Sequence, residues 1–149
     1  MQLVIAGGVV LPLIVTAALL VGSVAVGRDT VGAPPAGALQ LEVVGHQWWW
    51  EVHYLDGDNG RIATVANEIH VPVGRPVALR LKSYDVIHSF WAPNLQGKTD
   101  LIPGRENAAW FQVDAAGVYR GQCAEFCGTQ HALMAFVIVA EPAASFDAW

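Results

Sequence analysis

The sequence Leu39-Gln-Leu-Glu-Val-Val44 places Leu39, Leu41 and Val43 at every second position. Because successive side chains of a β-strand point to opposite faces, this spacing predicts a strand with one buried face. The stretch Val77-Ala-Leu-Arg-Leu-Lys82 shows the same alternation. Together the two segments predict that the chain from about residue 39 onward is built from β-strands.

Further segments have strand-like composition and are bounded by turn residues. They are residues 47–54, 68–71, 86–90, 107–113, 117–122 and 135–141. Turns rich in Gly, Pro, Asp and Asn separate them, at residues 56–60, 72–74, 103–104 and 115–117. No segment after residue 30 keeps a helical period. The pattern therefore predicts a mainly β fold, either a β-sandwich or a Greek-key barrel.

The first part of the chain differs from the rest. Residues 1–27 contain no Asp, Glu, Lys or Arg, and residues 3–26 are almost wholly apolar. This run exceeds the ~20 residues that a helix needs to cross a bilayer. A cleaved signal peptide is the alternative, but no basic residue precedes the run, and a signal's apolar core is shorter. We expect a transmembrane helix over residues 1–28, a stiff linker over residues 29–38 and a β domain over residues 39–149.

Composition excludes two classes of protein. Of the 149 residues, 54% are hydrophobic and only 14% are charged, which is too apolar for an intrinsically disordered chain. The formal net charge is −5, and the 8 Lys and Arg residues are scattered singly. This distribution argues against nucleic-acid binding, which needs clustered positive charge to neutralise phosphates.

Both cysteines lie in the stretch Gly121-Gln-Cys-Ala-Glu-Phe-Cys-Gly-Thr-Gln-His-Ala-Leu-Met134. This stretch and the predicted strand 86–90 together supply five side chains of metal-binding type: His88, Cys123, Cys127, His131 and Met134. Thiolate, imidazole and thioether form a soft ligand set, which favours copper, and the thioether in particular favours copper over zinc.

These residues allow four arrangements. A disulfide between Cys123 and Cys127 would close a short, restrictive loop and leave the histidines and Met134 without a role. A zinc site would use two cysteines and two histidines but not Met134. A mononuclear blue copper site takes one cysteine, two histidines and a methionine, so the second cysteine would be surplus. Two copper ions bridged by both thiolates, with one histidine each and weak axial ligands from Met134 and a loop carbonyl, use every residue.

The dinuclear arrangement also suits a defined kind of chemistry. Two metals that share one unpaired electron spread the change in charge on reduction, so their bond lengths change little. A closed ligand set on a rigid β frame leaves no position for a substrate. We therefore expect fast single-electron transfer at this centre rather than catalysis by the chain alone.

Several segments resemble subunit II of the haem–copper cytochrome c oxidases. They are residues 45–51 (GHQWWWE), 83–93 (SYDVIHSFWAP), 98–105 (KTDLIPGR) and 117–134. The resemblance implies a cupredoxin-like Greek-key β-sandwich that carries a dinuclear CuA centre on the periplasmic side of the membrane. By position, it implies that the copper ligands are His88, Cys123, the backbone carbonyl of Glu125, Cys127, His131 and Met134.

The resemblance also implies partners. Trp48 would be the point where electrons arrive from cytochrome c or a small copper protein, and the Glu125 side chain would reach a Mg²⁺ site shared with subunit I. The chain would be a single-pass protein of the bacterial inner membrane, in contact with lipid, subunit I and subunit III. Haem would lie only in the partner subunit, where oxygen reduction is coupled to proton pumping. The motif Cys-x-x-Cys-His is absent, so no covalent haem is expected.

The sequence departs from the family in two further ways. Family members usually have two transmembrane helices, and we find one such segment. An acidic run that would dock a basic cytochrome c is also absent. Asp85, Lys98, Asp100 and Arg105 are nonetheless expected to contact subunit I.

Other aromatic and histidine residues have simpler interpretations. On a continuous strand, Trp48 and Trp50 would share one face and Trp49 the other, so at least one of them is expected in the core. The remaining histidines are expected to be surface or hydrogen-bonded core residues rather than ligands: His46, His53 and His70.

Other functions remain as alternatives. A membrane-tethered copper-delivery protein would need exposed, exchangeable ligands, which a closed ligand set does not provide. The CuA domain of nitrous oxide reductase carries a similar motif but is joined to a much larger catalytic domain. Quinol oxidase subunit II lacks the two cysteines and the methionine, so Cys123, Cys127 and Met134 argue against it.

Overall fold

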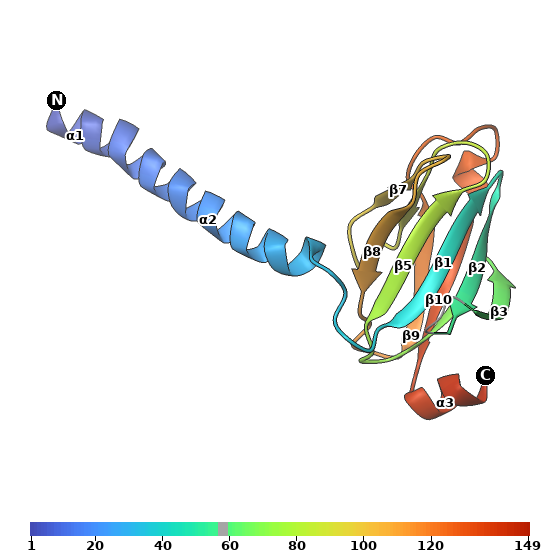
Figure 1. Cartoon of the computed structure of the whole chain (residues 1–149). Helices are drawn as coiled ribbons and strands as arrows, with labels where there is room; N and C mark the ends of the chain where they lie inside the picture. The colour runs from blue at the N-terminus through green and yellow to red at the C-terminus, as the bar shows by residue number, and fades with distance from the viewer. Residues whose placement is uncertain (57–59) are drawn as a thin grey trace. The chain divides into compact units, whose positions relative to one another are not determined.

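The computed structural model describes residues 1–56 and 60–149, without the side chains of residues 29–31. The chain divides into two compact units, Met1–Ala33 and Pro34–Trp149. The first is helical and contains α1 (Gln2–Ile5), the π-helical η1 (Ala6–Val10) and α2 (Leu11–Val31). The second contains the strands and a short helix (Figure 1). The predicted turn at residues 56–60 lies mostly outside the described residues.

The first unit contains an apolar run long enough to cross a membrane. Its segment Gln2–Arg28 has a mean hydropathy of 2.6 and is not buried within the protein. Pro12 lies in the first turn of α2, directly after η1. A proline has no N–H to donate to the preceding turn, and the wider π turn accommodates this loss. The helix continues to Val31, beyond residue 28 where the sequence placed its end, because backbone hydrogen bonding in a helix does not require apolar side chains.

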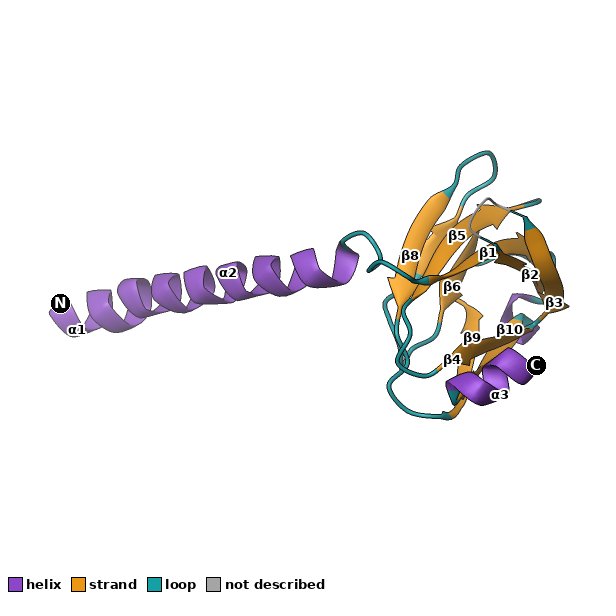
Figure 2. Ribbon diagram, turned by 60° about the horizontal axis from the view of Figure 1, so that its bottom comes forward, coloured by secondary structure: helices purple, strands orange, loops and turns teal. Residues whose placement is uncertain are grey.

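The second unit is a sandwich of two five-stranded sheets (Figure 2). The first sheet, in spatial order, contains β3 (Arg61–Ala66), β2 (Trp49–Leu55), β1 (Leu39–His46), β5 (Val77–Ser83) and β8 (Asn107–Phe111). The second contains β4 (Glu68–Pro72), β10 (Ala135–Glu141), β9 (Gly117–Cys123), β6 (His88–Trp91) and β7 (Thr99–Leu101). The pairs β1–β5 and β4–β10 are parallel. The prediction of a mainly β fold is confirmed.

The prediction of one continuous strand through the tryptophans was wrong. Gln47 and Trp48 form the turn between β1 and β2, and His46 pairs with Trp49 across it. Trp48 is half-buried in this turn, Trp49 is exposed and Trp50 is fully buried. Trp48 and Trp50 therefore do not share a strand face, because the chain reverses direction before Trp49.

The predicted strands differ from the observed ones at other points too. Strand β6 begins at His88 and ends at Trp91, rather than spanning residues 86–90. The strands β3 and β7 and the helix α3 (Ala143–Ala148) were not predicted. The strand β10, in contrast, has the predicted bounds.

An aromatic cluster forms the centre of the core between the sheets. Phe90 stacks on Phe136 with ring centroids 4.2 Å apart, and Trp50 meets both rings edge-on at 5.6 and 5.5 Å. The ring of Phe136 also covers Gly121, its cross-strand partner, where a Cβ would lie only 2.0 Å from the ring. Only glycine fits there without moving a buried ring. Trp50 also contacts the His88 ring edge-on, so this imidazole packs directly against the aromatic core.

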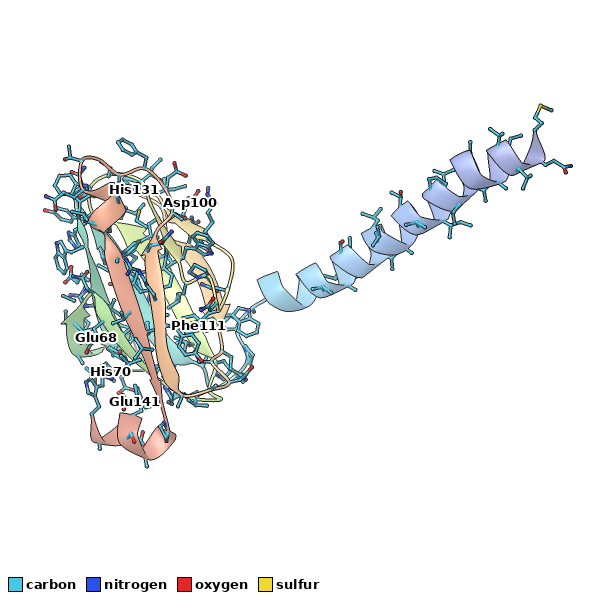
Figure 3. All side chains as sticks on the ribbon, turned by 180° about the vertical axis from the view of Figure 1, so that it is seen from behind. Glu68, His70, Asp100, Phe111, His131 and Glu141 are labelled. Carbon is cyan, nitrogen blue, oxygen red and sulfur yellow. The ribbon has the colours of Figure 1, made fainter. Side chains whose placement is uncertain are left out.

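A polar cluster lies beside α3, far from His131 in the fold (Figure 3). The Nδ1 atom of His70 is 2.5 Å from a carboxylate oxygen of Glu141, and its Nε2 is 3.0 Å from one of Glu68. The ring stacks on Trp149 at 4.3 Å between centroids. Burial lowers the pKa of His70, but the bonds to the two carboxylates outweigh it and raise the pKa above 6.5.

We expect this cluster to stabilise the fold more at low pH than at high pH. Since the pKa of His70 is higher in the folded chain than in the unfolded one, its contribution is complete below the unfolded value and disappears as the pH rises through the folded value. The melting temperature of the detergent-solubilised chain should therefore exceed that of His70→Gln by a few degrees in acid, and less in alkali. The control Glu141→Gln should weaken this pH dependence. A difference that grows with pH would contradict the expectation.

Candidate metal centre

The residues of metal-binding type meet at one end of the sandwich. His88 begins β6 and Cys123 ends β9, and these strands are neighbours in the second sheet, where Phe90 pairs with Cys123. The loop from β9 to β10 carries the other predicted ligands, including His131 in the short 3-10 helix η2 (His131–Leu133). Strand pairing thus brings His88 next to residues far along the chain.

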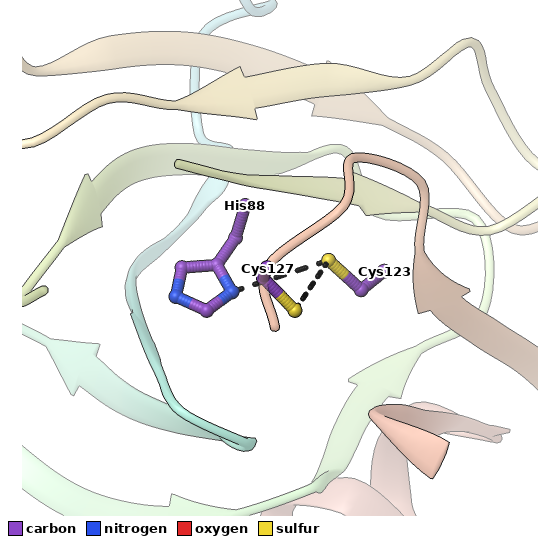
Figure 4. A group of neighbouring side chains, drawn as sticks. All are labelled: His88, Cys123 and Cys127. Carbon is purple, nitrogen blue, oxygen red and sulfur yellow. Dashed lines mark hydrogen bonds between the residues drawn. The ribbon is translucent and has the colours of Figure 1, made fainter. Parts of the chain in front are cut away.

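Cys123 lies beside the sulfur of Cys127 and the imidazole of His88 (Figure 4) and also beside the backbone carbonyl of Glu125. Its Sγ is 3.8 Å from Cys127 Sγ, 4.0 Å from His88 Nδ1 and 3.2 Å from the backbone oxygen of Glu125. Both cysteines are buried and free, so the disulfide alternative is wrong for this structure. Among the described residues, the group able to hold a metal ion with three His, Cys or carboxylate ligands is His88, Cys123 and Cys127.

Cys127 has a matching set of neighbours. Its Sγ is 3.6 Å from His131 Nδ1 and 3.7 Å from Met134 Sδ. Each sulfur therefore lies near one imidazole and near one atom that could serve as a weak metal ligand. The weak ligand is the Glu125 carbonyl oxygen beside Cys123 and the Met134 thioether beside Cys127. The site is nearly symmetric about the pair of sulfurs.

The pKa values of the two thiols move in opposite directions. Burial raises the pKa of Cys123, but hydrogen bonds with His88, with the Glu125 and Ser89 backbone and with His131 together outweigh burial and lower the pKa to about 6. Burial and the neighbouring charge on Cys123 both raise the pKa of Cys127. Because a metal binds cysteine as the thiolate, a bound cation must displace the proton that the raised pKa favours on Cys127.

Asp85 holds the imidazole of His88 in place. A carboxylate oxygen lies 2.8 Å from His88 Nε2 and accepts its proton, which orients the ring so that Nδ1 faces Cys123 Sγ. The carboxylate also accepts the backbone N–H groups of Val86 and Gln47, each at 2.7 Å. Burial raises the pKa of Asp85, but these bonds lower it further than burial raises it. The sequence suggested only a subunit contact for Asp85.

The turn between β1 and β2 reaches the ligand loop. Gln47 Nε2 and Trp48 Nε1 both donate to the backbone oxygen of Cys127, at 2.8 and 3.1 Å. Gly128 permits this approach, since its φ is +119° and a Cβ there would lie 2.9 Å from Gln47 Nε2. Sequence analysis singled out Trp48 but missed Gln47, because an amide next to an aromatic run carries no signal of a metal site.

The remaining histidines and charges have other partners. His46 Nε2 lies 2.9 Å from Glu51, and the buried His53 pairs through Nδ1 with Thr64 at 2.9 Å. At the rim of the site, Lys98 Nζ lies 3.8 Å from the Glu125 carboxylate. Asp100 accepts a hydrogen bond from Ser89, the residue after His88.

The fold and the site define a cupredoxin-like domain with a sulfur- and imidazole-rich centre at one end. The family model "Cytochrome C oxidase subunit II, periplasmic domain" matches residues 55–141. The chain belongs to the cytochrome c oxidase subunit II family, which confirms the resemblance.

Relatives of known name agree with this assignment. Cytochrome c oxidase subunit 2 of Alkalihalophilus pseudofirmus is 42% identical over 109 residues, which cover 73% of this chain and 31% of the relative. A probable cytochrome c oxidase subunit 2 of Rickettsia bellii is 35% identical over 157 residues, covering 94% and 58% of the two chains. The matched part of the chain therefore spans 31% and 58% of the length of these two curated relatives.

Solved structures show the same domain. The periplasmic domain of subunit II of cytochrome oxidase (CoxB) of Bradyrhizobium japonicum is 33% identical, with a TM-score of 0.71 over 77% of this chain and 92% of that one. A mixed-disulfide intermediate between a thioredoxin-like protein and subunit II of cytochrome c oxidase is 34% identical, with a TM-score of 0.67 over 80% and 92%.

Proposed function

We propose that this chain carries a dinuclear CuA centre that accepts single electrons and passes them to the haem of subunit I. The observation that carries the proposal is the paired geometry of the two reduced sulfurs. They lie 3.8 Å apart, and each has its own imidazole, at 4.0 and 3.6 Å. A zinc site would leave the Met134 thioether unused, and a mononuclear copper site would leave one thiol unused.

The surroundings of the donor set fit bound copper and electron transfer. When bound, the copper pair supplies one-electron redox chemistry shared between two metals and two sulfurs. Buried Cys123, Cys127, Met134 and His88 keep water away from it. This burial disfavours a copper-delivery role, which needs ligands that a partner protein can reach.

Trp48 is the proposed point of electron arrival. Its half-buried indole connects the surface to the Cys127 backbone through one hydrogen bond. Large apolar side chains are exposed on the segments around it, and we propose that they dock a cytochrome c or a small copper protein: Trp49, Tyr84, Ile87, Phe126 and Leu133.

The same proposal covers location and partners. The apolar helix would anchor the chain in the bacterial inner membrane, with the β domain on the periplasmic side against subunits I and III. Oxygen reduction and proton pumping would then be properties of the assembled oxidase. Mg²⁺ binding by Glu125 stays a prediction, and this carboxylate faces Lys98 at 3.8 Å.

Copper loading of the full chain in detergent tests the centre directly. We expect two coppers per chain, a purple colour and a seven-line EPR pattern, all of which the family resemblance implies. One copper per chain, or a spectrum confined to one metal, would contradict the proposal.

Trp48→Phe tests the route of the electrons. The phenyl ring keeps the apolar contact but loses the N–H bonded to Cys127, so the chain should still bind two coppers. Reduction by cytochrome c in a stopped-flow experiment should slow severalfold. The matched control is Trp149→Phe, since Trp149 stacks on His70 in the polar cluster beside α3, far from the ligand loop, and it should keep the parent rate. Equal rates for Trp48→Phe and the parent would remove Trp48 from the route.

A further inference from the structure

We propose that Gln47 is a positioning residue of the metal centre. From the opposite sheet, it is hydrogen-bonded both to Asp85, which orients His88, and to the backbone of Cys127. The inference rests on the proposed copper function and adds a residue that sets the potential of the centre. The ligands all come from the second sheet and its loops, whereas Gln47 lies in the turn between β1 and β2 of the first.

Gln47 makes two hydrogen bonds that lead to different ligands. Its backbone N–H donates to Asp85 at 2.7 Å, and Asp85 accepts the Nε2 proton of His88 at 2.8 Å. Its side-chain Nε2 donates to the backbone oxygen of Cys127 at 2.8 Å. One residue thus connects the outer nitrogen of one imidazole with the backbone of one bridging cysteine.

The bond to Cys127 also governs the contact of Trp48. A carbonyl oxygen has two lone pairs, and here Gln47 and Trp48 use one each, at 2.8 and 3.1 Å. The shorter bond from Gln47 fixes the plane of the peptide that follows Cys127. With the plane fixed, the second lone pair faces the indole. Without Gln47 the peptide is free to rotate, and the indole contact lengthens.

The backbone of the ligand loop is shaped for this amide. Gly128 adopts a φ of +119°, which L side chains rarely adopt, and a Cβ would lie 2.9 Å from Gln47 Nε2 and 3.1 Å from the Trp48 ring. The Gln47 amide thus meets the ligand loop in two ways: it donates a hydrogen bond to the Cys127 oxygen, and it packs where a side chain at residue 128 would lie. Gln47 is itself exposed, so its replacement buries no unpaired group and opens no cavity.

The sign of the effect follows from electrostatics. A donor on the Cys127 carbonyl withdraws electron density from the residue that supplies the sulfur, which favours the reduced centre and raises its potential. Gln47→Leu removes that donor at nearly the same size. Gln47→Glu replaces it with a negative charge facing the carbonyl oxygen. We expect the reduction potential to fall in the order parent, Gln47→Leu, Gln47→Glu.

The experiment loads the parent chain and the variants with copper in detergent. It measures copper content, the EPR hyperfine pattern, the reduction potential and the melting temperature of the metal-free chain. Support requires the expected order of potentials with an altered hyperfine pattern, or loss of copper with an unchanged metal-free melting temperature. The matched control is Gln122→Leu, an exposed glutamine next to Cys123, which should change none of these quantities.

An unchanged or higher potential in Gln47→Leu would overturn the inference. A fall in the metal-free melting temperature that accompanies copper loss would also overturn it, because Gln47 would then be a structural residue only. Failure of the parent chain to bind two coppers would instead refute the proposed function, before any variant is compared.

Discussion

Replacing Cys127 with serine is expected to abolish the dinuclear centre. The Cys127 sulfur contacts the other sulfur at 3.8 Å, His131 at 3.6 Å and Met134 at 3.7 Å, so three other donors gather around this one atom. A serine hydroxyl is a hard donor and a poor bridging ligand for copper. Copper per chain should fall from two to one or none, and the seven-line EPR pattern should disappear. Cys123→Ser should behave in the same way.

Met134→Leu is the informative control for the cysteine variants. Its thioether contacts only the Cys127 sulfur among the described donors, so leucine should leave two coppers in place and shift the potential. Copper analysis and EPR of both variants distinguish a bridging ligand from an axial one. A Cys127→Ser chain that stayed purple with an electron shared between two metals would show that the bridging assignment is wrong.

Gly121→Ala is expected to destabilise the domain strongly. The added methyl group would lie 2.0 Å from Phe136, whose buried ring stacks on buried Phe90 at 4.2 Å between centroids. Neither ring has space to withdraw, so the cost should reach the upper end of overpacking, about 3 kcal/mol. For a domain of this size that corresponds to a loss of about 10 °C in melting temperature.

Gly97→Ala provides the comparison for that measurement. No atom lies within 4 Å of the position of its Cβ, and its backbone is not in the left-handed region. It should melt within about 1 °C of the parent, as surface substitutions usually do. A Gly121→Ala chain with the parent's melting temperature would mean that the Phe136 ring is not fixed as described.

The sequence was most informative where local pattern and chemistry agree. The alternation in residues 39–44 and 77–82 predicted β1 and β5, because one face of each strand is buried. The spacing of Cys123, Cys127, His131 and Met134 indicated a metal site, since no structural role needs those four side chains together. The pairing of β6 with β9, which brings in His88, is visible only in the fold.

The main errors concern features fixed by distant contacts. Residues 47–50 resemble a strand because aromatic residues favour strands, and neither Gln47 nor Trp48 gives a turn signal. The turn is held instead by Asp85 and by the Cys127 carbonyl. Strand β3 was missed because most of it is exposed, which leaves no clear alternation. Helix α3 is too short to show a helical period.

The position of the β1–β2 turn has a consequence for how the protein matures. The ligands belong to one sheet, but the bonds that hold them come from the other, joining residues 80 and 79 positions apart in the chain. A newly made chain that has formed only the second sheet would lack these hydrogen bonds and would bind metal weakly. If the proposed copper centre forms, we therefore expect folding to precede copper binding, and a copper donor to recognise the folded sandwich rather than an emerging peptide.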